Sequence, residues 1–322
     1  MRRLIIFLFA VFLLFILCSC ELSYQAPAVG KMHILVYGND YRYGAYSPVD
    51  GLYYSSVRFE DGTLYSGKAK SLSCTVADAT EIGKTFSALA EKAGLEYTIT
   101  YLTGSQHTNL ASFKTAIGNI AADSNDNDIT ILYFSCHGHY LGIKGKKIPY
   151  GTDTTDNTFI AFRQDTNSDE NVLFPISKTV SLFDSIKGVK VVVGDFCYSG
   201  SLVQAGNVSI TSGEYTLLDP ATLLFKYRDE IRESSSMFCL SAARYNEESW
   251  EDKTVGHGYF TSALLKALGW DEENQCLKTA EAEKDNRITL SEIAKYVIAH
   301  DGEAKQTPMV SGGSNDIVLF SF

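Results

Sequence analysis

Two short, almost uninterrupted apolar runs constrain the fold of this chain more than any other feature of its sequence. They are Ile129-Thr130-Ile131-Leu132-Tyr133-Phe134 and Val189-Lys190-Val191-Val192-Val193, and both are rich in β-branched residues. Neither run alternates apolar and polar residues as a half-exposed strand does. Runs of this kind, with helical segments between them, are typical of a parallel sheet covered on both faces. The sequence therefore predicts an α/β fold, a mostly parallel sheet flanked by helices on both faces.

The remaining pattern extends this alternation along the chain. Further strands are expected at 33–37, 97–101, 237–241 and 317–320, and helices at 78–93, 109–122, 177–186, 259–268 and 288–299. Residues 39–73 have no helical period and hold six tyrosines, which indicates a surface excursion that could contain a hairpin. Residues 285–292 have some features of a calcium loop, but a capping box from Thr289 to Glu292 explains them better. No proline-rich break divides the alternation, so one domain is expected.

Charge and cysteine content exclude several classes of protein. The chain has 28 Lys and Arg against 38 Asp and Glu, a formal net charge of -10. Nucleic acid is therefore not an expected partner, because phosphate binding needs a basic surface. Seven cysteines without a CxxC pair suggest neither a disulfide scaffold nor a zinc site.

The N-terminus has the pattern of an export signal. Arg2 and Arg3 precede an uncharged run at 4–17, whose 14 residues span only about 21 Å of helix against roughly 30 Å of bilayer core. The ending Leu17-Cys18-Ser19-Cys20 resembles a bacterial lipobox, in which Cys20 would be lipidated. We expect a signal peptide at 1–19, a tether at 20–30 and an exported, membrane-anchored lipoprotein of the cell envelope. An uncleaved N-terminal anchor is the alternative.

A histidine and a cysteine follow the two buried runs directly. The first run ends in Ser135-Cys136-His137-Gly138, and the second in Gly194-Asp195-Phe196-Cys197. Ligands of open α/β sheets bind at the carboxyl ends of the strands, so both side chains are expected at one edge of the sheet. A cysteine nucleophile needs a nearby imidazole, and glycines let backbone N–H groups approach a developing oxyanion. The residues therefore suit acyl transfer to cysteine.

These motifs resemble those of the caspase–metacaspase superfamily of cysteine peptidases. Phe134-Ser135-Cys136-His137-Gly138 is similar to the family's F-S-G-H-G, and Asp195-Phe196-Cys197-Tyr198-Ser199-Gly200 is similar to D-x-C-H-S-G. Gly258-Tyr259-Phe260-Thr261 resembles the start of a family helix, G-x-F-T. The resemblance covers 31–322 and implies a caspase-like domain with a large half at 31–202, a linker at 203–236 and a small half at 237–322.

The resemblance implies a set of roles. His137 and Cys197 would form the catalytic dyad, and the backbone of Gly138 and of Cys197 would supply the oxyanion donors. The side chain before the scissile bond would bind at Asp195, Ser135 and Asp78, which implies peptide or protein substrates cleaved after Arg or Lys. Self-processing would fall in the linker, and the basic residues there are Lys226, Arg228 and Arg232. Relatives often need calcium, so calcium is a possible activator, with the acidic loop at 123–128 as a candidate site.

Departures from the pattern leave alternatives open. Cys136 replaces a glycine, Tyr198 replaces a histidine, and Cys74 lies one residue further from Asp78 than the family's pocket cysteine does. Cys197 could be an inert buried thiol, and Asp195 could only cap a turn. His139 and His257 are rival bases, although His257 follows no buried strand and is expected in a loop. A metal site at 136–139 is not expected, and Cys74, Cys239 and Cys276 are expected to be structural.

The competing functions are a catalytically silent lipoprotein that acts as a binding module, and a redox or acyl-transfer role without proteolysis.

Overall fold

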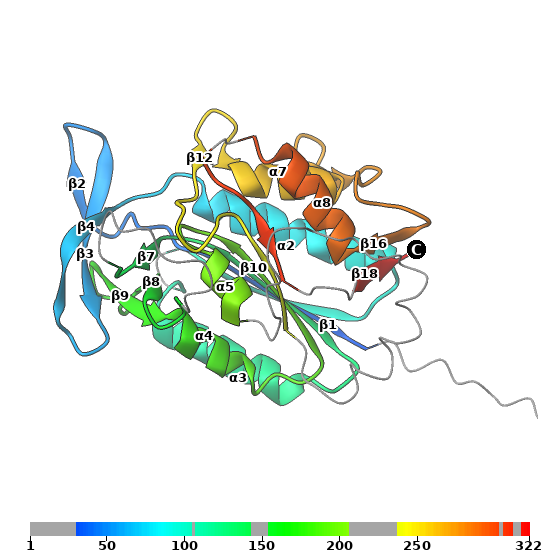
Figure 1. The fold of residues 1–322 in the computed structure, drawn as a ribbon, viewed down its shortest axis with the longest axis horizontal. Helices are drawn as coiled ribbons and strands as arrows, with labels where there is room; N and C mark the ends of the chain where they lie inside the picture. Colours follow the sequence, from blue (N-terminus) through cyan, green and yellow to red (C-terminus); the bar gives the residue numbers. More distant parts are fainter. Residues whose placement is uncertain (1–29, 105–106, 143–153, 206–236, 303–304, 312–316) are drawn as a thin grey trace, which may run out of the picture.

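A computed structural model describes residues 30–104, 107–142, 154–205, 237–302, 305–311 and 317–322 (Figure 1). The expected signal peptide, Cys20 and the tether up to residue 29 lie outside these residues, as do Lys226, Arg228 and Arg232. Within the described ranges, no helix is both long and apolar enough to cross a membrane.

A six-stranded sheet forms the centre of the molecule, in the order β17-β11-β10-β6-β1-β5. Five of its strands are parallel and β17 is antiparallel. The strands are β1 (Met32–Gly38), β5 (Tyr97–Thr103), β6 (Ile129–Ser135), β10 (Val189–Asp195), β11 (Met237–Ser241) and β17 (Met309–Val310). The two apolar runs are β6 and β10, which pair directly and are almost wholly buried. This confirms the predicted parallel sheet.

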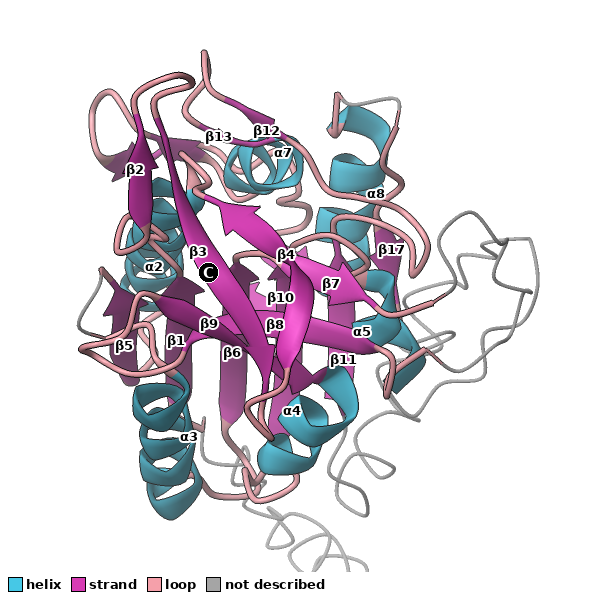
Figure 2. Cartoon of the chain, turned by 90° about the vertical axis from the view of Figure 1, so that its left-hand side faces the viewer, coloured by secondary structure: helices cyan, strands magenta, loops and turns pink. Residues whose placement is uncertain are grey.

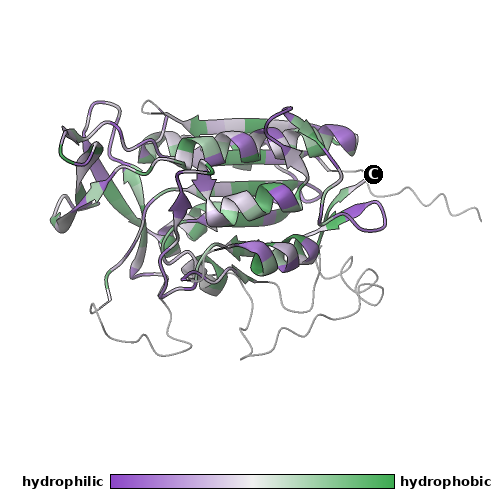
Figure 3. Ribbon diagram, turned by 90° about the horizontal axis from the view of Figure 1, so that it is seen from above, coloured by the Kyte–Doolittle hydropathy of each residue, from purple (hydrophilic) through white to green (hydrophobic). Residues whose placement is uncertain are grey.

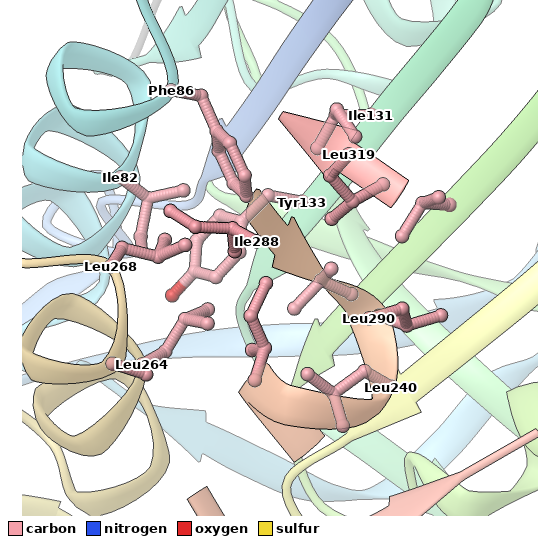
Figure 4. Close-up of a cluster of buried hydrophobic side chains, with 14 of the residues drawn as sticks. Ile82, Phe86, Ile131, Tyr133, Leu240, Leu264, Leu268, Ile288, Leu290 and Leu319 are labelled. Atoms are coloured by element: carbon pink, nitrogen blue, oxygen red, sulfur yellow. The ribbon is translucent and has the colours of Figure 1, made fainter. Parts of the chain in front are cut away.

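Helices cover both faces of this sheet, as the continuous burial of its strands requires (Figures 1 and 2). The first face is covered by α2 (Thr75–Lys92), α7 (Tyr259–Ala267) and α8 (Leu290–His300), and the second by α3 (Leu110–Asp123), α4 (Ile176–Phe183) and α5 (Gly200–Ala205). The core on the first face joins residues of α2, α7 and α8 to strand residues such as Ile131 and Tyr133 (Figure 4). The helices carry both hydrophilic and hydrophobic residues, as amphipathic helices do (Figure 3).

Local sequence signals set the helix boundaries. Gly94, in the left-handed region at φ 67°, follows the end of α2, and Asn109 caps α3 by accepting from Ser112 N. The capping box predicted at Thr289 and Glu292 is present at the start of α8, so this interpretation is confirmed over the calcium loop.

A second sheet lies at the end of the molecule where β6 leads into β7 (Figures 1 and 2). Its strands are β2 (Ala45–Ser47), β3 (Leu52–Phe59), β4 (Leu64–Lys70), β7 (Gly138–Tyr140), β8 (Thr158–Arg163) and β9 (Glu170–Pro175). The expected excursion at 39–73 thus supplies three strands, and β3 and β4 form the hairpin. The other three strands were not predicted, although Phe159–Phe162 and Val172–Phe174 are short apolar runs that could have signalled β8 and β9.

Three small antiparallel pairs complete the structure. They are β12 (Glu251–Asp252) with β13 (His257–Gly258), β14 (Trp270–Asp271) with β15 (Cys276–Leu277), and β16 (Arg287–Thr289) with β18 (Val318–Ser321). The strand predicted at 317–320 is therefore present as β18, but it pairs with β16 and not with the central sheet.

Candidate active site

The candidate residues lie at the carboxyl ends of two neighbouring strands. Ser135, the last residue of β6, pairs with Asp195, the last residue of β10. His137 and Cys197 each follow two residues after this pair, and Cys136 N donates to Asp195 O at 3.3 Å. The parallel register therefore brings both predicted catalytic residues to the same edge of the sheet.

The imidazole of His137 is held from two directions. Its Nε2 lies 2.6 Å from the carbonyl oxygen of Lys70, which can only accept a hydrogen bond, so Nε2 carries a proton. The neutral ring then keeps Nδ1 free to accept a proton. The ring also packs 4.5 Å from the ring of Tyr41, measured between centroids, and the backbone N–H of His137 donates to Tyr41 Oη at 2.6 Å. Burial lowers the pKa of His137, which favours this neutral form.

The thiol of Cys197 is half-buried and points to a backbone carbonyl. Its Sγ donates to the carbonyl oxygen of Ser249 at 3.7 Å. Burial raises the pKa of this thiol to about 12, so it is protonated in the resting protein. No hydrogen bond joins Cys197 to His137 in the described part of the chain. The raised pKa of Cys197 and the lowered pKa of His137 mean that the two groups rest as a neutral thiol and a neutral imidazole.

Gly138 lies directly against the backbone of the nucleophile. A Cβ atom at this position would come within 1.9 Å of the carbonyl oxygen of Cys197, so a side chain cannot be accommodated without moving the backbone. Tyr198, immediately after Cys197, adopts a left-handed conformation at φ 63°, and its N–H donates to Glu247 O at 2.7 Å. The close approach and the strained turn together fix how the Cys197 loop faces the end of β6.

The three predicted substrate-binding residues are also brought together. Ser135 Oγ donates to Asp78 Oδ2 at 2.8 Å. Gly258 separates Asp78 from Asp195, because its N–H donates to Asp78 Oδ1 at 3.2 Å and a Cβ on it would lie 2.3 Å from Asp195 Oδ2. Burial, followed by the negative charge of Asp78, raises the pKa of Asp195 to about 7. The two carboxyl groups thus form a buried acidic pair, and Asp195 lies two residues before the nucleophile and acts on its thiol.

Asp195 has partners that its sequence context did not indicate. Its Oδ1 accepts from Ser249 Oγ at 2.6 Å, and its Oδ2 accepts from the hydroxyl of Thr261 at 2.6 Å and from the backbone N–H of Thr261 at 3.3 Å. Asp195 therefore caps the first turn of α7 rather than the turn that follows β10, which corrects the capping alternative. Ser249 was not predicted, since one residue in a polar loop carries no sequence signal.

The expectation that His257 is an ordinary loop residue is wrong. His257 forms β13 with Gly258, its side chain is 3% exposed, and its Nδ1 lies 2.7 Å from Asp78 Oδ1. Its Nε2 lies 2.6 Å from Glu272 Oε1. The only sequence signal was its place directly before the Gly-x-Phe-Thr helix start. His139, the other rival base, lies on β7 with its ring centroid 6.0 Å from that of His137, and burial lowers its pKa to about 3.

The other cysteines and the candidate calcium loop differ in part from expectation. Cys74 and Cys239 are buried, as structural residues would be, but Cys276 is exposed. In the loop at 123–128, Asp128 accepts from His33 Nε2 and from the backbone N–H groups of Lys31 and Asn125. Asp123 binds Lys31 Nζ at 2.5 Å. Asp123 and Asp128 thus already have protein donors, and the described residues hold no group of three or more side chains that could bind a metal ion.

Comparison with known protein families identifies the family of this chain. The family model described as Caspase domain matches residues 62–316, which contain His137, Cys197 and the acidic pair. The chain belongs to the caspase domain family. No curated protein sequence matches this caspase domain.

Solved protein structures resemble this chain at low sequence identity. One is a protein of Geobacter sulfurreducens, with 18% identity, a TM-score of 0.48 and coverage of 88% of this chain and 94% of that chain. Another is caspase-1 from Spodoptera frugiperda, with 12% identity, a TM-score of 0.47 and coverage of 90% of each chain.

Proposed function

We propose that this caspase domain is a membrane-tethered cysteine endopeptidase that cleaves after arginine or lysine. The observation that carries the proposal is the placement of His137 and Cys197 at the ends of the adjacent strands β6 and β10, with Nδ1 of His137 left free to accept a proton. Membership of the caspase domain family supports a peptidase of this class. Membrane tethering would use lipidation at Cys20, and its support is the N-terminal sequence alone.

The chemistry follows from the resting protonation states. Substrate binding would turn the Cys197 thiol from Ser249 O towards His137, where Nδ1 removes its proton as the sulfur attacks the peptide carbonyl. The resulting oxyanion would be stabilised by the backbone N–H groups of Gly138 and Cys197. Protonated His137 then gives its proton to the leaving amine, and the acyl-enzyme is hydrolysed by a water molecule that His137 deprotonates.

A basic residue before the scissile bond would be selected by the acidic pair. Ser135 and Asp78 are in contact, Asp195 lies near both Asp78 and the nucleophile, and two carboxyl groups attract a cationic side chain. Cleavage within the chain itself would fall after Lys226, Arg228 or Arg232, all of which lie outside the described residues.

The proposal is tested with the body of the protein, residues 21–322, under reducing conditions. We expect release of the reporter from Arg- and Lys-ended peptide amides but not from Asp- or Asn-ended ones, and no release by Cys197→Ala or His137→Ala. Assays with and without calcium test the possible activator. A correctly folded protein that turns over none of the four peptides would instead support the silent binding module, and preference for Asp would overturn the role of the acidic pair.

A further inference from the structure

The imidazole of His257 lies between two carboxylates. Its Nδ1 faces Asp78 Oδ1 at 2.7 Å and its Nε2 faces Glu272 Oε1 at 2.6 Å. A neutral imidazole carries one N–H and can donate to only one of them, whereas an imidazolium donates to both. The geometry therefore calls for the charged form. Both contacts are short, as expected for charge-assisted hydrogen bonds.

The surroundings of His257 stabilise this charge. Burial lowers its pKa, but the hydrogen bonds to Asp78 and Glu272 outweigh burial and raise the pKa to about 9. The other ionisable groups near this cluster come from neighbouring elements: Asp195 on β10, Tyr133 on β6, Cys74 before α2, Glu251 and Asp252 on β12, and Lys253 in the turn after β12. The acids among these groups are negative or neutral near pH 7, and the cation among them, Lys253, is exposed and acts on Cys74.

The position of this cation bears on substrate selection. Asp78 is one of the two carboxyl groups proposed to attract the basic side chain, and it is already paired with His257 inside the protein. A substrate cation that approaches Asp78 and Asp195 would also approach His257, and repulsion between the two cations would offset part of the attraction. An uncharged side chain would not meet this repulsion.

We propose that His257 is a specificity-determining residue. Its positive charge competes with the substrate for Asp78. This competition limits the preference for a charged over an uncharged side chain before the scissile bond. This inference rests on the proposed function, since it requires Asp78 and Asp195 to face that side chain.

The test compares two nearly isosteric substrates. Peptide amides that end in arginine or in citrulline differ in charge but hardly in shape. Ionisation of the dyad affects kcat/KM for both substrates equally, so its effect cancels in the ratio of the two values. We expect His257→Gln to raise the arginine-to-citrulline ratio at pH 7.5 by about tenfold, which corresponds to about 1.4 kcal/mol, because glutamine can still donate to Asp78 but carries no charge. In the unsubstituted protein the ratio should rise between pH 8 and 10 as His257 loses its proton. In the variant it should stay flat between pH 8 and 10, a range that lies above the pKa of Asp195.

Two further variants keep the test decisive. His33→Gln changes another buried histidine that faces a carboxylate, with Nε2 3.1 Å from Asp128 Oδ2 but at the amino end of β1, and it should leave the ratio unchanged. Glu272→Gln changes a half-exposed residue, so the fold should tolerate it. It should shift the rise of the ratio to lower pH, because His257 loses a stabilising charge.

Failure of the inference and failure of the proposed function give different results. The inference alone would be overturned if both variants turn over substrate with an unchanged ratio and the ratio of the unsubstituted protein stays flat between pH 8 and 10. Absence of turnover in every folded protein would overturn the proposed function, and the inference with it.

Discussion

At the scale of single residues, the candidate dyad depends on groups that are not catalytic themselves. Tyr41 is fully buried, its hydroxyl accepts from His137 N, and the same hydroxyl donates to Ala161 O at 3.1 Å. Its ring packs against the imidazole of His137. Tyr41 is therefore a positioning residue, which fixes the backbone and the ring of the proposed base at the same time.

Removing this hydroxyl tests the positioning role. We expect Tyr41→Phe to lower kcat by about tenfold with little change in KM, because the ring still packs but the backbone N–H of His137 loses its acceptor, a loss of roughly 1–2 kcal/mol. Steady-state kinetics on the Arg-ended peptide amide would measure this. Tyr43→Phe is the matched control, since Tyr43 donates to Asn171 and does not contact His137. Equal effects of the two variants would contradict the assignment.

The buried charge of His257 also has a consequence for stability. Its pKa is 6.5 in the unfolded chain and about 9 in the folded protein, so the folded state binds this proton more tightly. The stabilisation is complete below pH 6.5 and is lost as the pH rises towards about 9. We expect the free energy of unfolding in urea to fall by roughly 2 kcal/mol between about pH 6.5 and pH 8.5. His257→Gln should show a clearly smaller fall, and parallel curves for the two proteins would refute the charged state.

At the scale of elements, the contact between the loop after β6 and the loop after β10 is the tightest constraint on the site. Gly138 opens β7 by pairing with Ile160, while its Cα lies against the carbonyl of Cys197. Substitution here pushes on backbone and not on a movable side chain, and the strand pairing opposes any relief.

Two glycine-to-alanine variants separate this contact from a general effect of the substitution. Gly138→Ala should abolish turnover or lower it at least a hundredfold, and thermal unfolding should show a lower Tm. Gly118→Ala, in α3, would meet nothing within 4 Å, so it should be neutral or stabilising by up to about 1 kcal/mol through helix propensity. Activity near the unsubstituted level in Gly138→Ala would show that the two loops can move apart.

The elements also show how far the sequence could predict the structure. The central strands and their helices were predictable, because continuous burial leaves a continuous apolar run and Asn109, Gly94 and Thr289 mark helix ends. The second sheet was not, because β7 and β2 have three residues each and β3 pairs with β9 across more than a hundred residues. For the same reason, the His257 contact with Asp78 was missed: it joins positions 179 residues apart, and only the fold makes them neighbours.

At the scale of the whole molecule, the two halves are joined by contacts that do not depend on the linker. β10 pairs with β11 from Lys190–Met237 to Gly194–Ser241, and α7 and α8 share a core with α2. The acidic pair adds polar contacts, since Asp78 binds His257 and Asp195 binds Thr261. Part of the candidate site therefore comes from each half.

We expect the protein to stay in one piece after its chain is cut between the halves. A recognition sequence for a site-specific protease, inserted within 206–236, would allow the cut to be made in the Cys197→Ala variant. The two fragments should elute together from a sizing column at the volume of the uncut protein and separate only in denaturant. Two peaks under native conditions would mean that the shared sheet and core are not sufficient to hold the halves together.

The acceptor that fixes the protonation of His137 is the main-chain oxygen of Lys70, whose own side chain is exposed. Every amino acid presents the same oxygen, so a side-chain substitution at this position leaves the acceptor in place and removes only the charge of Lys70, which also lowers the pKa of His137. The position of the acceptor therefore depends on the path of the β3–β4 hairpin and not on the identity of the residue. An amide-to-ester replacement after Lys70 would weaken this oxygen as an acceptor, and it would also remove the N–H that Ser71 donates to Tyr53 O at 2.7 Å.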